Sequence, residues 1–118
     1  MYLSYNTMKD RTAPLIEKRK HLAEQMPDPS SALTGSLMSR MVRCNKPNCR
    51  RCQKGGKGHG PIWILSVRES QGRVRQITVP QHLKPEVEEG LKRFAAIQSL
   101  LRQIGEVNQQ LLEERKRS

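Results

Sequence analysis

Aromatic side chains are scarce in this chain of 118 residues. Tyr2, Tyr5, Trp63 and Phe94 make up 3% of it, and all hydrophobic residues together make up 35%. A chain with so few large apolar side chains builds a small core, and such domains usually depend on a metal ion, disulfides or a partner subunit. Few side chains are left to line a deep apolar pocket. We therefore expect no enzymatic activity and no small-molecule substrate.

Long hydrophobic runs are also missing. No segment approaches the roughly 18 apolar residues that a membrane-spanning helix needs. Residues 1–10 lack the apolar stretch and the cleavage site of a secretory signal peptide. We expect a cytoplasmic protein that binds no membrane, in a compartment that keeps thiols reduced.

Acidic residues are almost absent from the middle of the chain. Residues 29–83 contain ten Lys and Arg but one acidic residue, Glu69, so most of the formal net charge of +11 lies there. This density of positive charge attracts polyanions, of which nucleic acid is the commonest. A role in solubility alone is the alternative. The ten predicted nucleic-acid contacts are Arg40, Arg43, Lys46, Arg50, Arg51, Lys54, Lys57, Arg68, Arg73 and Arg75.

Cysteines are few, and all three lie in one loop rich in glycine, asparagine and proline. An odd number of thiols cannot pair completely, and clustered thiols in a reducing compartment more often bind a metal than form disulfides. A histidine follows closely, which completes the four thiolate and imidazole donors that tetrahedral zinc prefers. We predict a closed, structural Zn²⁺ site that stabilises the fold of residues 44–79, with the ligands Cys44, Cys49, Cys52 and His59.

Other uses of these residues remain open. His82 is a rival fourth ligand, and the thiols could also be free. The Cys-x4-Cys-x2-Cys spacing matches plant-type iron–sulfur proteins, but that cluster needs a fourth cysteine. A nucleophilic pair of a cysteine with His59 would leave two thiols unexplained. Residues 54–58 resemble a phosphate-binding loop only superficially, since the full motif is absent.

Local signals predict a small metal-stabilised α+β fold. We expect an N-terminal helix from Thr12 to about Gln25, a zinc knuckle loop, and a two-stranded antiparallel hairpin of residues 62–68 and 73–79. Residues 1–10 are expected to fray, and residues 37–42 are too mixed to assign. The expected divisions are 1–36 (helix and linker), 37–83 (knuckle and hairpin) and 84–118 (terminal helix).

The hairpin register can be predicted from its turn. A three-residue loop, Ser70–Gly72, pairs Leu65 with Ile77 and Trp63 with Val79, and it gathers the apolar side chains on one face. It also puts Gly72 where a left-handed backbone is wanted.

The last third predicts one long helix from Pro85 to about Lys116, because no further proline interrupts it. Its apolar residues recur at a near-heptad spacing that is typical of a coiled coil or an antiparallel helix pair. We expect a homodimer or a helix-mediated protein partner. The alternative is packing on the hairpin and N-terminal helix of the same chain. The predicted oligomerisation residues are Phe94, Ile97, Leu101, Ile104, Asn108 and Leu111.

Several motifs occur in a distinctive order: Gly35-Ser36-Leu37, the cysteine cluster, His59-Gly60-Pro61, an aromatic strand, a glycine turn and a basic strand. In this order they resemble a family of short bacterial proteins classed as a domain of unknown function, over residues 35–112. The resemblance implies a cysteine cluster, a hairpin and a terminal helix, and an association with mobile genetic elements. Family members often have one residue between the last two cysteines, whereas this chain has Arg50 and Arg51.

Together these features predict a zinc-stabilised accessory protein that binds DNA or RNA and self-associates through its terminal helix. The alternative is an adaptor or assembly protein. Its long helix would bind a larger nucleic-acid enzyme, such as the recombinase of a mobile element.

Overall fold

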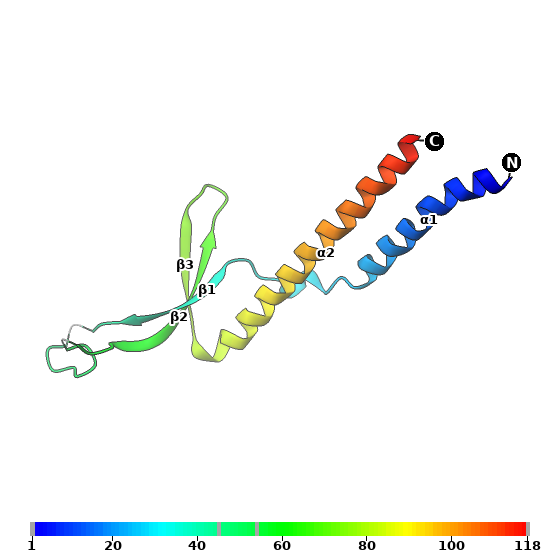
Figure 1. Ribbon diagram of the computed structural model, residues 1–118. Helices are drawn as coiled ribbons and strands as arrows, with labels where there is room; N and C mark the ends of the chain where they lie inside the picture. The colour runs from blue at the N-terminus through cyan, green and yellow to red at the C-terminus, as the bar shows by residue number, and fades with distance from the viewer. Residues whose placement is uncertain (1, 45, 54, 118) are drawn as a thin grey trace. The chain divides into compact units, whose positions relative to one another are not determined.

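The structure, a computed structural model, describes residues 2–44, 46–53 and 55–117 (Figure 1). It confirms the expected α+β class with an N-terminal helix, an antiparallel sheet and a long C-terminal helix. Two compact units are formed: residues up to Ser30 with those from Arg93 onward, and residues 31–92. The elements are α1 (Tyr2–Glu24), the 3-10 helix η1 (Pro29–Ser31), β1 (Ser36–Val42), β2 (His59–Arg68), β3 (Val74–Val79), the 3-10 helix η2 (Gln81–Leu83) and α2 (Lys84–Arg117).

The predicted hairpin is confirmed, including its register. In β2 and β3, Leu65 lies opposite Ile77 and Trp63 lies opposite Val79. The Glu69 N–H donates to the Arg73 carbonyl at 2.7 Å, which closes a loop of three residues. Gly72 has a φ of +85°, the left-handed conformation that this turn requires.

The sheet has a third strand that the sequence did not assign. β1 pairs antiparallel with β2, so the strand order is β1-β2-β3. The expectation of a two-stranded sheet is therefore incomplete. Residues 36–42 lack a clean alternation of apolar and polar side chains, and only Leu37 and Val42 are half-buried. Pairing with β2 makes this segment a strand, and strand propensity depends strongly on such context.

Both faces of β2 carry a buried side chain. Leu65 is buried on the face that the sequence predicted to be apolar, and Ile64 is buried on the opposite face. Ile77, which was expected on the apolar face, remains 39% exposed. The central strand thus supplies most of the core of the unit formed by residues 31–92.

Helix α1 is longer than expected. It begins at Tyr2 rather than Thr12, and Pro14 lies inside it instead of near its first turn. The backbone of residues 2–10 is helical in the structure, and fraying of these turns stays a prediction. A proline inside a helix removes one backbone hydrogen bond, but the residues before it can still form helical turns.

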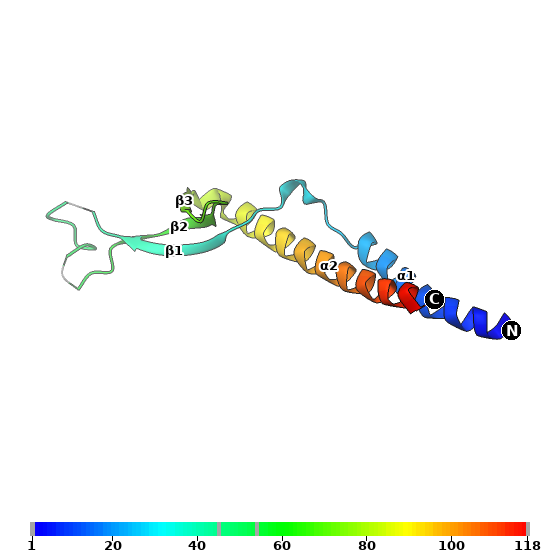
Figure 2. The same ribbon diagram turned by 90° about the horizontal axis from the view of Figure 1, so that it is seen from above.

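The other unit is an antiparallel pair formed by α1 and the later part of α2, which lie side by side in both views (Figures 1 and 2). Leu22 of α1 packs with Val107 and Leu111 of α2. Arg19 also donates a hydrogen bond to the Asn108 side-chain oxygen at 3.1 Å. The alternative of packing within the chain is therefore realised with α1.

The predicted oligomerisation stripe is only partly used in this packing. Leu111 is buried and Ile104 packs against the same cluster, whereas Leu101 is 58% exposed. Phe94 and Ile97 are half-buried. Self-association through the remaining stripe stays a prediction. In the described residues, neither α2 nor any other helix combines the length and the hydrophobicity that a bilayer span requires.

Candidate metal centre

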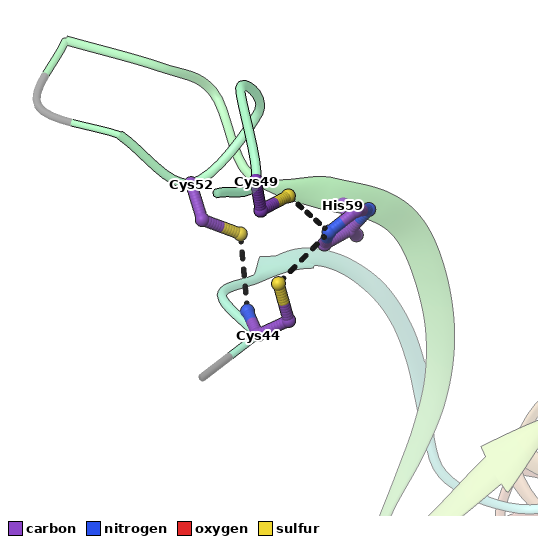
Figure 3. Close-up of side chains that lie close together, drawn as sticks. All are labelled: Cys44, Cys49, Cys52 and His59. Carbon is purple, nitrogen blue, oxygen red and sulfur yellow. Dashed lines mark hydrogen bonds between the residues drawn. The ribbon is translucent and has the colours of Figure 1, made fainter. Parts of the chain in front are cut away.

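The four predicted metal ligands lie together at one end of the sheet (Figure 3). The sulfur atoms of Cys44, Cys49 and Cys52 and a ring nitrogen of His59 all lie within 4.8 Å of one another. The His59 Nε2 atom is 3.0 Å from the Cys49 Sγ atom and 3.3 Å from the Cys44 Sγ atom. His82 belongs to η2 and is not part of this cluster.

The ends of two paired strands bring the first and last of these residues together. Val42, near the end of β1, is the register partner of His59, the first residue of β2. Cys44 follows two residues after Val42, so it comes to lie beside the imidazole. The pairing of β1 with β2, which no local signal predicts, therefore holds the first ligand close to the fourth.

Two consecutive turns place the middle ligands. The Cys49 N–H donates to the Lys46 carbonyl at 3.3 Å, and the Cys52 N–H donates to the Cys49 carbonyl at 3.2 Å. Each turn folds the chain back within three residues, so the two thiols face the same point. Pro47 and Asn48 are typical turn residues at the centre of the first turn, whereas Arg50 and Arg51 occupy the centre of the second.

A second layer of hydrogen bonds supports the ligands. The Cys44 N–H donates to the Cys52 Sγ atom at 3.0 Å, which holds this sulfur beside the first ligand. The Arg43 guanidinium donates to the carbonyls of Cys52 at 3.0 Å and Gly56 at 2.9 Å. Arg43 therefore ties the end of β1 to both sides of the loop. This bracing role was missed by the sequence analysis, because an arginine beside a cysteine carries no signal for it.

The thiols differ in acidity. Hydrogen bonding from the Cys44 thiol, helped by backbone N–H groups, lowers the pKa of Cys49 to about 6. The Lys46 backbone N–H acts to lower the pKa of Cys44, but the hydrogen bond to Cys49 and burial outweigh it, and the pKa of Cys44 is raised. Metal binding requires the deprotonated thiolate, and Cys49 is the thiol that the surroundings favour in that form.

The donor set fits a small tetrahedral ion. Metal–sulfur bonds of about 2.3 Å and metal–nitrogen bonds of about 2.0 Å place tetrahedral donors roughly 3.5 to 3.8 Å apart. The observed spacing of the donor atoms is compatible with these values after small adjustments. Three sulfurs and one imidazole complete the coordination of such an ion, so the cluster can hold a metal ion without an open position. Closed four-coordinate sites are typical of structural metals, whereas catalytic sites keep an open position.

Glycines flank the histidine ligand where the chain has no room for a side chain. Gly58 has a φ of +80°, and a Cβ atom there would lie 2.8 Å from the Val42 carbonyl oxygen. Gly60 has a φ of +131°, and its Cβ atom would lie 3.0 Å from the Arg40 carbonyl oxygen. The close approach of this chain to the end of β1 requires glycine on both sides of His59.

We predict that Gly58→Ala weakens metal binding at least about tenfold, because the added methyl group must push the β1 backbone away from His59. Gly55→Ala is the matched control. Gly55 has a nearly equal φ of +86° in the same loop, but open space surrounds its Cβ position. Competition with a chromophoric chelator measures both affinities. Equal losses in the two variants would show that the close approach at Gly58 is unimportant.

The structure places most of the predicted nucleic-acid contacts around this loop. Lys46, Arg50, Arg51 and Lys57 are exposed beside the ligands, and Arg40 is exposed on β1. Lys54 lies outside the described residues. Arg68 ends β2, and Arg73 precedes β3; both are exposed.

Two of the predicted contacts have partners within the chain. Arg43 donates to the loop carbonyls, and the Arg75 Nε atom forms an ion pair with Glu69 at 3.3 Å. This pair is largely exposed, so it contributes little to stability. The role of all ten residues in binding nucleic acid stays a prediction.

The model of a family described as a domain of unknown function (DUF6788) matches residues 12–89. The match covers most of α1, the whole sheet, the metal loop and the start of α2. The sequence motifs resemble the family over residues 35–112, so the match begins and ends earlier in the chain than expected. No curated protein and no solved structure matches the chain.

Proposed function

This chain belongs to the family of domains of unknown function DUF6788, and we propose that it is a zinc-stabilised, nucleic-acid-binding accessory protein. One observation carries the proposal. A Cys3His cluster is held at the end of a strand pair, and exposed cations surround it. Between Pro29 and Arg68 the sequence contains no Asp or Glu that could neutralise them.

Zinc is the metal that this donor set favours. Thiolate sulfur with one imidazole in a closed tetrahedral arrangement is typical of structural zinc sites. The unit of residues 31–92 has a small core, with Ile64, Leu65 and Val79 as its buried apolar side chains among the described residues. Metal binding would supply folding free energy that so few side chains cannot.

Nucleic acid is the ligand that the charge favours. Three thiolates and one Zn²⁺ leave a net charge of −1 at the centre, against seven Lys and Arg from Arg40 to Lys57. A strong positive excess therefore remains after the metal is bound. Cations of this kind contact phosphates, which gives affinity but little sequence preference.

We expect the purified protein to contain one zinc ion and to bind nucleic acid with a steep salt dependence. About six phosphate contacts predict a slope near −5 for log affinity against log salt concentration, or a loss of about 10³-fold between 50 and 200 mM. Elemental analysis and fluorescence anisotropy with a labelled oligonucleotide measure the two quantities. A flat salt response would contradict the proposal.

Matched variants locate the contacts. The double change of Arg50 and Arg51 to alanine should reduce the salt slope by about 2, one unit for each lost phosphate contact. Lys18→Ala removes an exposed cation of α1, outside the loop, and should leave the slope unchanged. Similar effects of both variants would mean that overall charge, rather than the loop, attracts the nucleic acid.

The proposal includes self-association through α2, and one observation favours a partner there. Leu101 and Leu112 are 58% and 66% exposed on this helix. The second candidate function is an adaptor that binds a larger enzyme of a mobile element with the same face. Sedimentation of the full chain distinguishes the two, because only self-association makes the mass depend on protein concentration.

A further inference from the structure

We infer that the nucleic acid is duplex DNA and that a two-stranded arm of this chain enters its major groove. The arm consists of residues 40–44 and 59–62 with the described parts of the metal loop, residues 46–53 and 55–58. This inference rests on the proposed function, because it names the form of nucleic acid and the element that binds it.

The arm is a ribbon of two strands. β3 pairs with β2 from Trp63 to Arg68, whereas β1 pairs with β2 as far as His59. On the N-terminal side of Trp63, from His59 to Ile62, the strand β2 therefore has β1 as its single neighbouring strand among the described residues. Both views show this ribbon continuing past β3 to the metal loop (Figures 1 and 2).

The width of the ribbon suits one groove of B-DNA. Two paired strands lie about 4.8 Å apart, and their side chains add to this width. The major groove, about 12 Å wide, admits a two-stranded ribbon, whereas the minor groove, about 6 Å wide, is too narrow without deformation of the duplex. The metal cluster would keep the far end of the ribbon closed.

Charge on the arm matches the phosphates that border a groove. Arg40 is exposed on the strand, and Lys46, Arg50, Arg51 and Lys57 are exposed on the loop. Arg43 donates hydrogen bonds to the loop carbonyls, and it thereby braces the loop that carries the exposed Lys and Arg side chains. No acidic residue lies anywhere in this part of the sequence to repel a polyanion.

Single-stranded nucleic acid is disfavoured because the arm offers no aromatic platform. Proteins that bind single strands stack bases on aromatic rings, and no aromatic residue occurs between Tyr5 and Trp63. Trp63, at the base of the arm, is already engaged. The Lys84 Nζ atom lies 4.0 Å from the centre of its ring, and its indole N–H donates to Gln81 at 3.1 Å.

Duplex RNA is disfavoured by groove shape. The major groove of A-form RNA is deep and narrow, and side chains do not reach its base edges. Its minor groove is wide and shallow, so a protruding ribbon would find no walls on either side. B-DNA is the duplex that presents a groove of matching width.

The test uses the full chain loaded with zinc and one 20-base-pair sequence, as duplex DNA, as single-stranded DNA and as duplex RNA. We expect duplex DNA to bind at least about tenfold more tightly than either other form at equal salt. A major-groove ligand such as methyl green should compete with the protein. Saturating netropsin, which fills the minor groove, should change the affinity less than about twofold.

Two charge reversals test the arm itself. Arg40→Glu should weaken duplex binding at least about tenfold more than Lys92→Glu, which makes the same charge change at an exposed position of α2. Measurements of zinc content and circular dichroism would serve as the control that both variants fold. Equal affinity for single strands, tighter binding of duplex RNA, competition by netropsin or equal effects of the two variants would each overturn the inference. Failure to bind any of the three nucleic acids would instead refute the proposed function.

Discussion

Replacing Cys49 with serine should leave the protein without bound metal and without an ordered metal loop. The Cys49 Sγ atom contacts the His59 ring, and its pKa, lowered to about 6, keeps this sulfur in the thiolate form that a metal requires at neutral pH. A serine hydroxyl stays protonated at neutral pH and is a poor zinc ligand. Metal content should fall from about one ion per chain to less than about 0.1, by elemental analysis.

Hydrogen exchange would show which residues lose their ordered structure when the metal is lost. Backbone amides of residues 46–53 and 55–62 should lose protection in Cys49→Ser, whereas amides near Val107 in α2 should keep it. His82→Ala is the control, because that histidine lies outside the cluster and its loss should leave the metal bound. Retention of a stoichiometric metal ion in Cys49→Ser would refute the metal centre.

Replacing Val107 with aspartate should destabilise the helix pair by about 3 to 5 kcal/mol, since it buries an unpaired charge. The Val107 side chain is 2% exposed, between Leu22 of α1 and the neighbouring apolar residues of α2. Urea unfolding followed by far-ultraviolet circular dichroism measures the free energy of unfolding. A marginally stable helix pair would lose most of its helical signal in this variant.

The control for this change is Leu112→Asp in the same helix. Leu112 is 66% exposed, so the new carboxylate stays in water and should cost at most about 1 kcal/mol. If both variants unfolded at the same urea concentration, α1 would not cover α2 as the structure describes.

The parts of the molecule that the sequence predicts well are those with local causes. The four ligands fall within residues 44–59, so their donor types could be recognised as one cluster, and short turns bring Cys49 and Cys52 together. The hairpin register follows from one turn, and Gly72 adopts the backbone conformation that the turn demands. In both cases the interacting residues are close in sequence, and little chain entropy opposes their contact.

The parts that were missed depend on partners far away in sequence. Residues 36–42 form a strand because β2 pairs with them, and that partner lies beyond the metal loop. The apolar stripe on α2 predicts that another apolar surface packs against this helix. In the structure part of that surface is Leu22 of α1. A heptad pattern cannot show whether the partner is another helix of the same chain or a second copy of α2.

Electrostatic reasoning from the sequence also has a physical limit. It counts Arg43 and Arg75 as two more cations for a polyanion. The structure gives each of them a partner, backbone carbonyls for Arg43 and Glu69 for Arg75. Local geometry decides whether a long cationic side chain contacts solvent, the backbone or a ligand. This geometry cannot be inferred from the amino-acid composition.

The strand order β1-β2-β3 has a consequence for how the protein behaves in concentrated solution. Among the described residues, the outer sides of β1 and β3 have no strand beside them. Open edges of this kind invite sheet-to-sheet joining and fibrous aggregates, and natural proteins often guard them with cations. Arg40 on β1 is such a cation, whereas the charge of Arg75 on β3 is partly neutralised by Glu69. A bound polyanion would neutralise Arg40 and with it the repulsion between molecules, so the tendency to aggregate would depend on the ratio of polyanion to protein.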